Sequence, residues 1–329
     1  MRAITYENFG PAGDVLTLEE IPAPTPAGGE VLVRLNTSGA NPSDVKMRAG
    51  GRPGVTRPPF PKTIPHSDGA GVIEAVGDDV SQARIGERVW IWNGQWQRAF
   101  GTAAEYIALP GNQAVALPDN VSFEAGAVLG IPGLTACCAV LGGGPVKGKT
   151  VLVSGGAGTV GHLAIQVAAA SDAHVLATAR GKAGLAAARS AGAAHVFDYA
   201  SDTLADEILE CVQGDLVDRI VEVEFGKNAE TNARIIAERG TIAAFGSALD
   251  MTPTLPFYPL MFKSVTIELL LVYLLSPERR ERTIKDLTGL LRQGALKFRI
   301  SDRFELADCA KAHDVIAAGG RAGSVILTI

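Results

Sequence analysis

The pattern of hydrophobic and polar positions changes near residue 122. Before that point, the segments 30–39, 68–77 and 86–92 have strand composition and are bounded by Gly and Asp. Prolines recur throughout this region, and they mark turns and edge segments rather than helices. We therefore predict that residues 1–122 are all-β and that the Pro-rich segment 50–65 is a loop over the surface or at a pocket mouth.

From residue 148 onward, short apolar runs alternate with segments of helical spacing. The predicted strands are 149–155, 173–179, 194–199, 217–224 and 240–246, and the predicted helices are 160–171, 184–192, 203–212 and 230–238. Ser122 and Glu124 indicate a capped helix start before them. A candidate last strand lies within 264–275, followed by a helix over 277–294 and a terminal strand over 323–329. Such alternation is typical of a parallel sheet with helices on both faces.

Composition narrows the class of protein. The chain has 329 residues, which favours two domains, and its hydrophobic fraction of 47% is ample for two cores. The net charge of −5 and the absence of a basic stripe argue against a general nucleic-acid binder. No secretory h-region opens the chain, and the apolar run 264–275 contains Glu268 and is too short to span a bilayer. We expect a cytoplasmic protein whose four cysteines are free thiols.

A glycine-rich turn carries the first chemical signal. The segment 150–162 contains Gly156-x-Gly158-x-x-Gly161 between a predicted buried strand and a predicted helix. The first glycine permits a tight turn, the second lets the backbone approach a pyrophosphate, and the third lets the helix pack close to the sheet. The segment therefore predicts a dinucleotide site at a positive helix end, and a plain Gly-rich turn is the alternative.

The end of the second predicted strand indicates which dinucleotide is bound. The segment 176–182 has no carboxylate to bond a ribose 2′-hydroxyl, and it carries two cations, Arg180 and Lys182. A guanidinium can hold a 2′-phosphate through two hydrogen bonds, so we predict a preference for NADPH. The alternative is that both cations only flank an ordinary helix start.

A family resemblance extends over nearly the whole chain. Its landmarks occur in family order: NPSD (41–44), DGAGVI (68–73), GERV (86–89), GTAAEY (101–106), GLTA (133–136), AGTVG (157–161), GAAHVFDY (192–199), GTIAAFG (240–246) and GRAGSVIL (320–327). Together they resemble the zinc-free quinone oxidoreductases, the zeta-crystallin-like family of the medium-chain dehydrogenase/reductase superfamily. Each landmark alone is weak, and the ordered set is specific.

The resemblance implies an α/β fold of two domains with a cleft between them. A GroES-like β domain would comprise 1–122 and be completed by the C-terminal segment 276–329. A Rossmann domain with a doubly wound parallel sheet would occupy 123–275. Members are usually dimers or tetramers, and we expect a homodimer or homotetramer joined through the strand within 264–275, where an apolar edge can be covered by a partner.

The resemblance also assigns site residues. Asn41 and Asp44 match the N-x-x-D segment and are the catalytic candidates, with Asn41 near the nicotinamide. The implied cofactor-binding residues are Asn41, Thr135, Gly156, Ala157, Gly158, Thr159, Val160, Gly161, Arg180, Lys182, Tyr199, Phe245, Gly246, Ser247 and Arg321. The predicted substrate residues are Lys46, Ile64, His66 and Trp92.

Several of these residues have plain structural alternatives. Asn41 could be a turn residue before Pro42, Thr135 a helix cap or core hydroxyl, and Tyr199 a half-buried strand aromatic. Lys46 stands where the family often has Tyr, so a role for a tyrosine hydroxyl fails here, and a solvated loop residue is its alternative. Glu222 and Glu224 lie where the family usually has one acid.

The same comparison argues against a catalytic zinc, so we expect no metal. In the zinc enzymes of the superfamily a Cys stands where Asn41 stands, and no cysteine precedes Cys137 here. Ser67, and not His66, aligns with their zinc-binding His. Zinc requires a set of Cys or His ligands, so the chemistry that stabilises an alkoxide is missing and alcohol oxidation is disfavoured.

Hydride transfer to a conjugated acceptor needs less help, because the developing charge spreads over the acceptor. We therefore predict an NADPH-dependent enzyme that reduces small-molecule quinones or conjugated carbonyls, with no nucleic-acid or membrane partner. The alternatives are an enone or alkenal double-bond reductase of the same family, a non-catalytic NADPH-binding protein of crystallin-like or RNA-binding type, and a residual metal-dependent alcohol dehydrogenase.

Overall fold

The computed structural model describes residues 1–51 and 54–329, and the chain folds into two compact units. Unit 1 comprises Met1–Ile131 and Phe298–Ile329, and unit 2 comprises Pro132–Lys297. The expected division placed 123–131 in the second domain and 276–297 in the first, so both boundaries differ from it. Residues 52–53 of the predicted 50–65 loop lie outside the described residues.

Among the described residues, unit 2 contains a six-stranded sheet in the order β10-β9-β8-β11-β12-β13. The strands are β8 (Thr150–Val153), β9 (His174–Ala179), β10 (His195–Asp198), β11 (Val217–Glu222), β12 (Ile236–Ala244) and β13 (Thr266–Leu269). All neighbours are parallel. Strand order reverses between β8 and β11, which is the doubly wound Rossmann arrangement that the sequence predicts.

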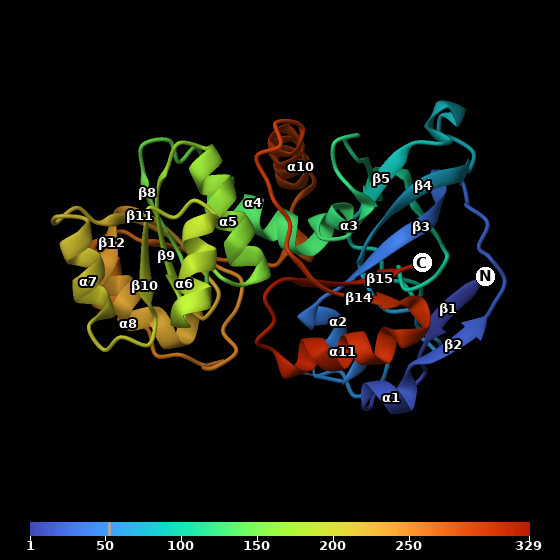
Figure 1. The fold of residues 1–329 in the computed structure, drawn as a ribbon, viewed down its shortest axis with the longest axis horizontal. Helices are drawn as coiled ribbons and strands as arrows, with labels where there is room; N and C mark the ends of the chain where they lie inside the picture. The colour runs from blue at the N-terminus through green and yellow to red at the C-terminus, as the bar shows by residue number, and fades with distance from the viewer. Residues whose placement is uncertain (52–53) are drawn as a thin grey trace. The chain divides into compact units, whose positions relative to one another are not determined.

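The helices of unit 2 follow the predicted segments. They are α4 (Leu134–Leu141), α5 (Thr159–Ala170), α6 (Gly181–Ser190), α7 (Leu204–Cys211), α8 (Phe225–Ile235), α9 (Phe257–Phe262) and α10 (Pro277–Arg292). Figure 1 shows α5 and α6 against strands β8 to β10. Helix α10 packs on α4, where the Cys137 thiol lies 3.7 Å from the carbonyl of Thr283. This contact explains why 276–297 belongs to unit 2.

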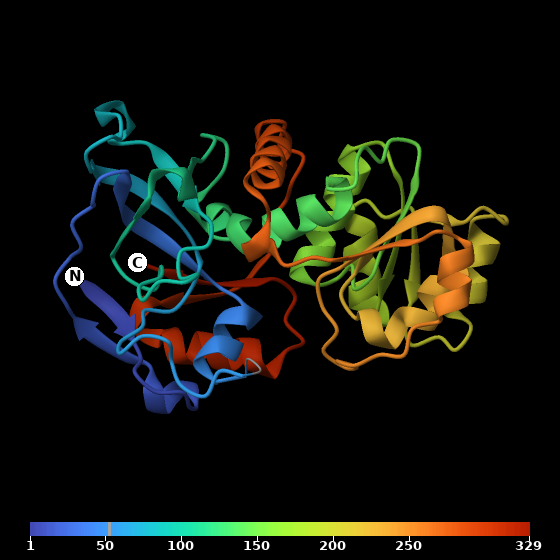
Figure 2. The same ribbon diagram turned by 180° about the vertical axis from the view of Figure 1, so that it is seen from behind.

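In the part of unit 1 that the structure describes, a seven-stranded sheet has the order β14-β15-β3-β4-β5-β7, with β6 paired to β3. Its strands are β3 (Glu30–Ala40), β4 (Asp68–Val76), β5 (Arg88–Ile91), β6 (Tyr106–Pro110), β7 (Ala114–Ala116), β14 (Ile300–Glu305) and β15 (Ser324–Thr328), and β1 (Arg2–Thr5) pairs with β2 (Thr17–Glu20) separately. The C-terminal strand β15 lies antiparallel to β3, with Val325 opposite Ala40. The C-terminal segment therefore completes the β domain, as expected (Figure 2).

Unit 1 is not all-β before residue 122, which corrects the prediction. It contains α1 (Ala12–Val15) and α2 (Pro42–Arg48), and then α3 (Phe123–Gly126) and α11 (Cys309–Ala318). Helix α2 was missed because it follows a strand directly and is short; Pro42 stands at its first turn, where a missing N–H costs nothing. Short helical turns are η1 (Gln82–Arg84), η2 (Gly111–Gln113), η3 (Leu129–Gly133), η4 (Val272–Leu274) and η5 (Leu306–Asp308).

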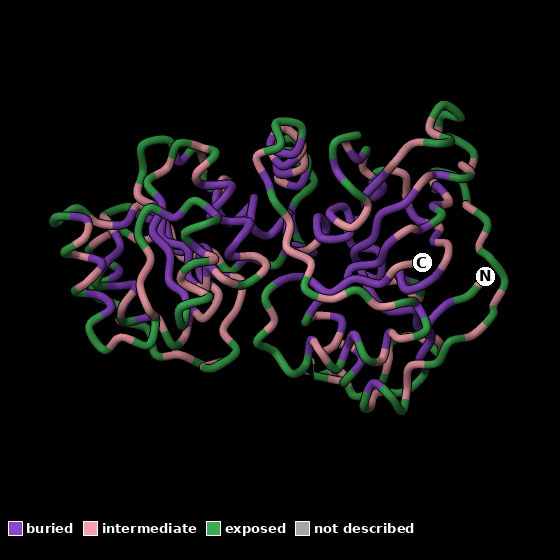
Figure 3. Tube along the Cα trace, in the orientation of Figure 1, coloured by how far each residue is buried: buried purple, intermediate pink, exposed green. Residues whose placement is uncertain are grey.

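Each unit has its own buried core, and the buried residues follow the strands (Figure 3). In unit 2, residues from β8, β9, β11 and β12 pack with α7 and α8 around Ile208, Ile220 and Ile242. Unit 1 has one cluster around Val33 and Ile107 inside its sheet and another around Ile64 and Cys309 beneath α11. In the described part of the chain, no helix combines the length and the apolar character that crossing a membrane requires.

Candidate dinucleotide and acceptor sites

The glycine-rich turn connects β8 to α5 in unit 2. Gly155 has a φ of +68°, and the Gly158 N–H donates to the Gly155 carbonyl at 2.9 Å. Gly158 is the N-cap of α5, and no side chain caps this helix end. The turn therefore brings the positive end of a 12-residue helix to the carboxyl edge of the sheet, with no cap from a described side chain.

The described geometry explains why glycine is needed at two positions of the motif. A Cβ on Gly161 would lie 2.3 Å from the carbonyl oxygen of Gly155, and one on Gly156 would lie 2.7 Å from Ile165. The close approach of α5 to the strand end therefore depends on the absence of these side chains. Such a backbone cradle at a helix start is the arrangement that accepts a pyrophosphate.

The predicted 2′-phosphate residues gather at the ends of β9 and β10. Asp198 of β10 pairs with Ala179 of β9, and the Tyr199 N–H donates to the Ala179 carbonyl at 3.1 Å. Arg180 and Tyr199 each follow one member of this pair, so they stand side by side at the sheet edge. Arg180, Lys182 and Tyr199 are all exposed. Two cations and an aromatic ring on one edge can bind a phosphate beside a flat base.

The loop after β12 is fixed by a carboxylate that the sequence interpretation left without a role. Phe245 donates its N–H to the Glu222 carbonyl at 3.0 Å, and Ser247 accepts the N–H of Gly226 at 2.9 Å. The Glu224 carboxylate accepts the N–H groups of Ala248 and Leu249, the latter at 2.9 Å. Glu224 thus anchors the segment that contains Phe245, Gly246 and Ser247, and its sequence signal was the second acid at the end of β11.

The side chain of the neighbouring acid, Glu222, stabilises the protein interior and not the loop after β12. It is 1% exposed, and its oxygens accept the Glu224 N–H at 2.7 Å, the Asn228 amide at 3.1 Å and the Asn232 amide at 2.9 Å. A buried carboxylate that accepts several hydrogen bonds is well compensated. Glu222 therefore ties β11 to α8.

In unit 1, the catalytic candidates form a buried polar cluster at the start of α2. Asn41 is 6% exposed and is the N-cap residue; its backbone N–H donates to the Asp44 carboxylate at 2.7 Å. Its side-chain amide donates to Asp68 at 2.9 Å. Asp44 therefore closes the helix start, and Asp68 orients the Asn41 side chain.

Asp68 lies in an environment that disfavours its charge. It is fully buried, and this burial, together with the nearby Asp44 charge, raises the pKa of Asp68 well above its ordinary value, while the hydrogen bond from Asn41 opposes the rise. Gly130 leaves room for this carboxyl, since a Cβ there would lie 2.3 Å from it. Perturbed carboxyl groups of this kind often occur at functional sites.

The four predicted substrate residues lie in different surroundings within unit 1. Lys46 is exposed on α2, and the Trp92 indole donates to the Asn112 carbonyl at 3.1 Å. Ile64 and His66 are completely buried, Ile64 in the apolar cluster beneath α11. Their assignment as substrate residues stays a prediction, and burial gives it no support.

Two further predicted residues stand apart from these groups. Thr135 is buried in the first turn of α4. Arg321 is half-buried and donates to the Ile316 carbonyl near the end of α11 at 3.3 Å.

A surface cavity of about 620 Å³ in unit 1 is lined by Glu7, Asn8 and the described residues 54–61. None of the predicted substrate residues lines it.

The side chains at the position of the superfamily's zinc do not suit that metal. Asn41 offers an amide that already donates to Asp68, and Ser67 offers a hydroxyl. Zinc prefers thiolate, imidazole and carboxylate ligands, and of Asn41, Ser67 and Asp68 only Asp68 offers one. This group of residues therefore does not fit a catalytic zinc.

Comparison with known proteins agrees with the fold. Residues 27–119 match the alcohol dehydrogenase GroES-like domain family, and residues 159–288 match the zinc-binding dehydrogenase family. The quinone oxidoreductase of Mus musculus is 32% identical over 341 residues, covering 100% of this chain and 98% of the relative. A crystal structure of quinone oxidoreductase from Pseudomonas syringae pv. Tomato DC3000 has a TM-score of 0.85 at 30% identity, covering 100% and 99%. A mycobacterial protein solved in complex with NADPH has a TM-score of 0.86 at 28% identity, covering both chains fully.

A GroES-like domain followed by a doubly wound nucleotide-binding domain defines a medium-chain dehydrogenase/reductase. Within that superfamily of oxidoreductases, the chain belongs to the quinone oxidoreductase family, because its likeness to these enzymes extends over its full length.

Proposed function

We propose that this protein is an NADPH-dependent reductase of quinones and other conjugated carbonyl compounds that works without a catalytic metal. The observation that carries the proposal is the backbone cradle of Gly155–Gly161, where the start of α5, which no described side chain caps, stands on the same sheet edge as Arg180 and Lys182. A pyrophosphate at the first and a 2′-phosphate at the second are the two anionic groups of NADPH.

The chain's own residues would hold this cofactor in three places. The N–H groups at the start of α5 bind the pyrophosphate, and Arg180, Lys182 and Tyr199 bind the adenosine end. The backbone of Phe245–Ser247, held in place through Glu224, flanks the nicotinamide end. When bound, NADPH supplies the hydride. NADPH-bound relatives of the same fold support this assignment.

On the acceptor side, Asn41 is the hydrogen-bond donor. Its amide nitrogen has two hydrogens, and one is held by Asp68 at 2.9 Å, which leaves the other in a fixed direction. A pre-oriented donor stabilises negative charge on a carbonyl oxygen without reorganising during the reaction. Water supplies the final proton. Asp44 acts indirectly, because it fixes the backbone at Asn41.

Hydride transfer in this proposal needs no metal, because Asn41, Ser67 and Asp68 together offer zinc a poor set of ligands. Quinones and enones spread the developing charge over a conjugated system, so one oriented amide donor gives enough stabilisation of that charge. Reduction of an enone or alkenal double bond uses the same groups, and it is included in the proposal as a related substrate class.

We also propose a homodimer that forms through the edge of the unit 2 sheet. β13 is the last strand in that sheet, and Leu269, Leu271 and Leu274 beside it are 77%, 48% and 66% exposed. Exposed apolar edge strands are normally covered by a partner. The cytoplasm is the proposed compartment, because all four cysteines are free and three of them are buried.

A panel of acceptors tests the function. NADPH oxidation is followed by stopped flow with 9,10-phenanthrenequinone, an enone and an alkenal, each with and without a metal chelator, and alcohol oxidation with NADP⁺ is the control reaction. We expect quinone turnover that the chelator does not change. No turnover with any acceptor would favour a binding protein, and chelator-sensitive alcohol oxidation would favour a metal-dependent dehydrogenase.

A further inference from the structure

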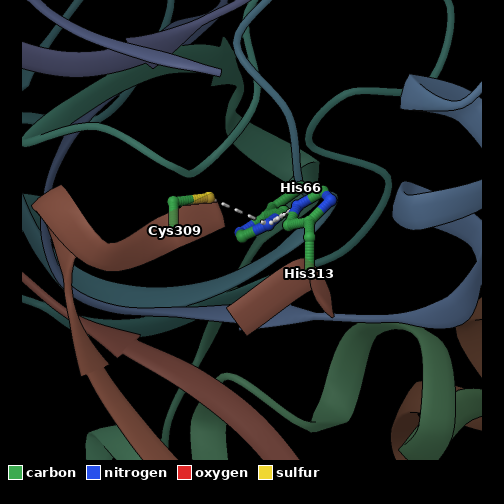
Figure 4. A group of neighbouring side chains, drawn as sticks. All are labelled: His66, Cys309 and His313. Atoms are coloured by element: carbon green, nitrogen blue, oxygen red, sulfur yellow. Dashed lines mark hydrogen bonds between the residues drawn. The ribbon is translucent and has the colours of Figure 1, made fainter. Parts of the chain in front are cut away.

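A buried cluster of His66, Cys309 and His313 lies in unit 1, and His66 is the one member that the sequence also predicts as a substrate residue. Figure 4 shows the three side chains pointing toward one another, two from α11 and one from the segment that precedes β4. Cys309 and His313 are four residues apart on α11, so they share one face of that helix. All three residues are fully buried, and their candidate ligand atoms lie within 4.8 Å of one another.

The hydrogen bonds around His66 fix its tautomer. The Thr102 hydroxyl donates to the Asp68 carbonyl, so it must accept from Ser38, with which it is paired at 2.8 Å. Ser38 has then used its one proton and must accept from Nδ1 of His66 at 2.9 Å. Nε2 of His66 therefore carries a lone pair directed into the cluster. An Nδ1–H held by an oxygen is the outer support that orients metal-bound histidines.

His313 and Cys309 both lie close to this lone pair. Nε2 of His313 lies 2.9 Å from Nε2 of His66, and Sγ of Cys309 lies 3.9 Å from the same atom. Two nitrogens bound to one ion are separated by about 3.4 Å, and a nitrogen and a sulfur by about 3.7 Å, given usual bond lengths. These two spacings differ from the expected values by about half an ångström or less, and all three ligand atoms lie within 4.8 Å of one another. Nδ1 of His313 is buried and has no hydrogen-bond partner among the described residues.

We propose that His66, Cys309 and His313 form a binding site for a soft monovalent metal ion, Cu(I). Two imidazoles and a thiolate are a ligand set for copper or zinc, and the charges nearby decide between them. Cys309 is completely buried, and the nearby Arg48 cation and Asp44 carboxylate act on it in opposite directions. Cu(I) with a thiolate adds no net charge to this buried place, whereas Zn(II) with a thiolate adds an uncompensated positive charge.

Ligand number points to the same ion. The described residues supply three ligands, and structural zinc sites use four. On binding, the Cys309 thiol releases its proton to solvent and its sulfur bonds to the ion, while both imidazoles stay neutral and no electron is transferred. The proposal goes beyond the reductase function, because neither Cys309 nor His313 has a role in the proposed hydride transfer.

The test counts ions on the purified full-length protein. The protein is equilibrated anaerobically with Cu(I) supplied as its acetonitrile complex, with long incubation because the site is buried, and is then desalted and analysed for copper. We expect one Cu(I) per chain for the unmodified protein and for Cys138→Ser, a matched control in which another buried thiol is removed. Cys309→Ser and His313→Gln should retain less than a tenth of this.

Three results would overturn the proposal. They are no retained copper in the unmodified protein, equal retention in Cys309→Ser, and retention of Zn(II) as tight as that of Cu(I) in a parallel incubation. Circular dichroism of each variant shows whether it is folded. X-ray absorption at the copper edge provides a second readout, and it should show one sulfur and two nitrogen neighbours. A spectrum without sulfur would contradict the site even if copper were retained.

Discussion

The side-chain amide of Asn41 donates a hydrogen bond to the carboxyl of Asp68 across 2.9 Å, and both residues are buried. The two residues come from different elements, the start of α2 and the start of β4. Asp68 therefore sets the direction of the group that we assign as the acceptor's hydrogen-bond donor.

Removing the acceptor at position 68 should misdirect Asn41. We expect Asp68→Leu to lower kcat with 9,10-phenanthrenequinone about tenfold, which corresponds to about 1.4 kcal/mol of lost transition-state stabilisation. The KM for NADPH should change less than twofold. Asp68→Asn keeps an oxygen acceptor and serves as the control, with near-normal kcat. Equal losses in both variants would mean that the carboxyl itself is needed.

Gly161→Ala should damage the dinucleotide site. The new Cβ would lie 2.3 Å from the Gly155 carbonyl oxygen, so α5 must move away from the strand end. We expect at least a hundredfold weaker NADPH binding in a fluorescence titration, and a loss of stability of about 1–3 kcal/mol from overpacking.

Gly184→Ala is the matched control for that change. Gly184 lies in α6, and its Cβ would meet Ala157 of the glycine-rich turn and Ala179 of β9 at 3.5 and 3.6 Å, which are ordinary van der Waals contacts. It should leave NADPH binding unchanged and raise stability by about 0.5–1 kcal/mol, because alanine is a better helix former. Weak NADPH binding in both variants would show that the effect does not come from the clash.

Arg180→Ala should affect the KM values for NADPH and NADH differently. We expect the KM for NADPH to rise tenfold or more and the KM for NADH to change less than twofold, because only NADPH has the 2′-phosphate. Arg189→Ala removes an exposed cation from the last turn of the same helix and should change neither value. Equal changes in the KM values for both cofactors would contradict the assignment of Arg180 to the 2′-phosphate.

The pair of Glu124 and Arg303 should make a small, pH-dependent contribution to stability. Two hydrogen bonds of 2.7 Å join α3 to β14, and they lower the pKa of Glu124, together with the Arg303 charge. A lowered carboxyl pKa gives stability that is present at neutral pH and is lost as pH falls through the folded-state value.

Because both side chains are partly exposed, Glu124→Gln should cost about 0.5 kcal/mol at pH 7 and less near pH 3. Urea unfolding at both pH values measures this difference. Arg303→Met should give a similar loss, and the double variant should lose no more than either single one. A larger cost at pH 3 than at pH 7 would contradict the sign.

Leu269→Lys should disrupt the proposed dimer. A charge on the exposed face of the edge strand β13 would oppose its coverage by a second copy. Sedimentation should show a dimer for the unmodified protein and a monomer for the variant. Ile85→Lys, at a 48% exposed position in unit 1, should remain a dimer. Monomeric behaviour of the unmodified protein would contradict the proposal directly.

Sequence patterns predict the parts of this molecule that are encoded locally. The alternation after residue 148 gives the strands and helices of unit 2, because each apolar run is buried against its neighbours in the chain. The end of β9 likewise places Arg180 and Tyr199 together, because parallel strands finish at one edge.

Contacts between distant residues could not be predicted in this way. His66 and His313 are separated by 247 positions, and their meeting depends on how α11 packs under the sheet of unit 1. The contact between Asp68 and Asn41 was not predicted, because Asn41 caps a helix too short to give a periodic signal. The boundary near 297 was missed because α10 packs on α4, a contact that the helical pattern of 277–294 does not encode.

The pairing of β15 with β3 also has a consequence for biosynthesis. The inner part of the unit 1 sheet joins residues near 40 to residues near 325, so β3 has an open edge until the end of the chain has been made. Unit 2 is continuous in sequence and can fold while synthesis proceeds. Nascent chains should therefore carry a finished nucleotide domain beside an incomplete β domain, and the long contact separation should make closure of that sheet the slow step of folding.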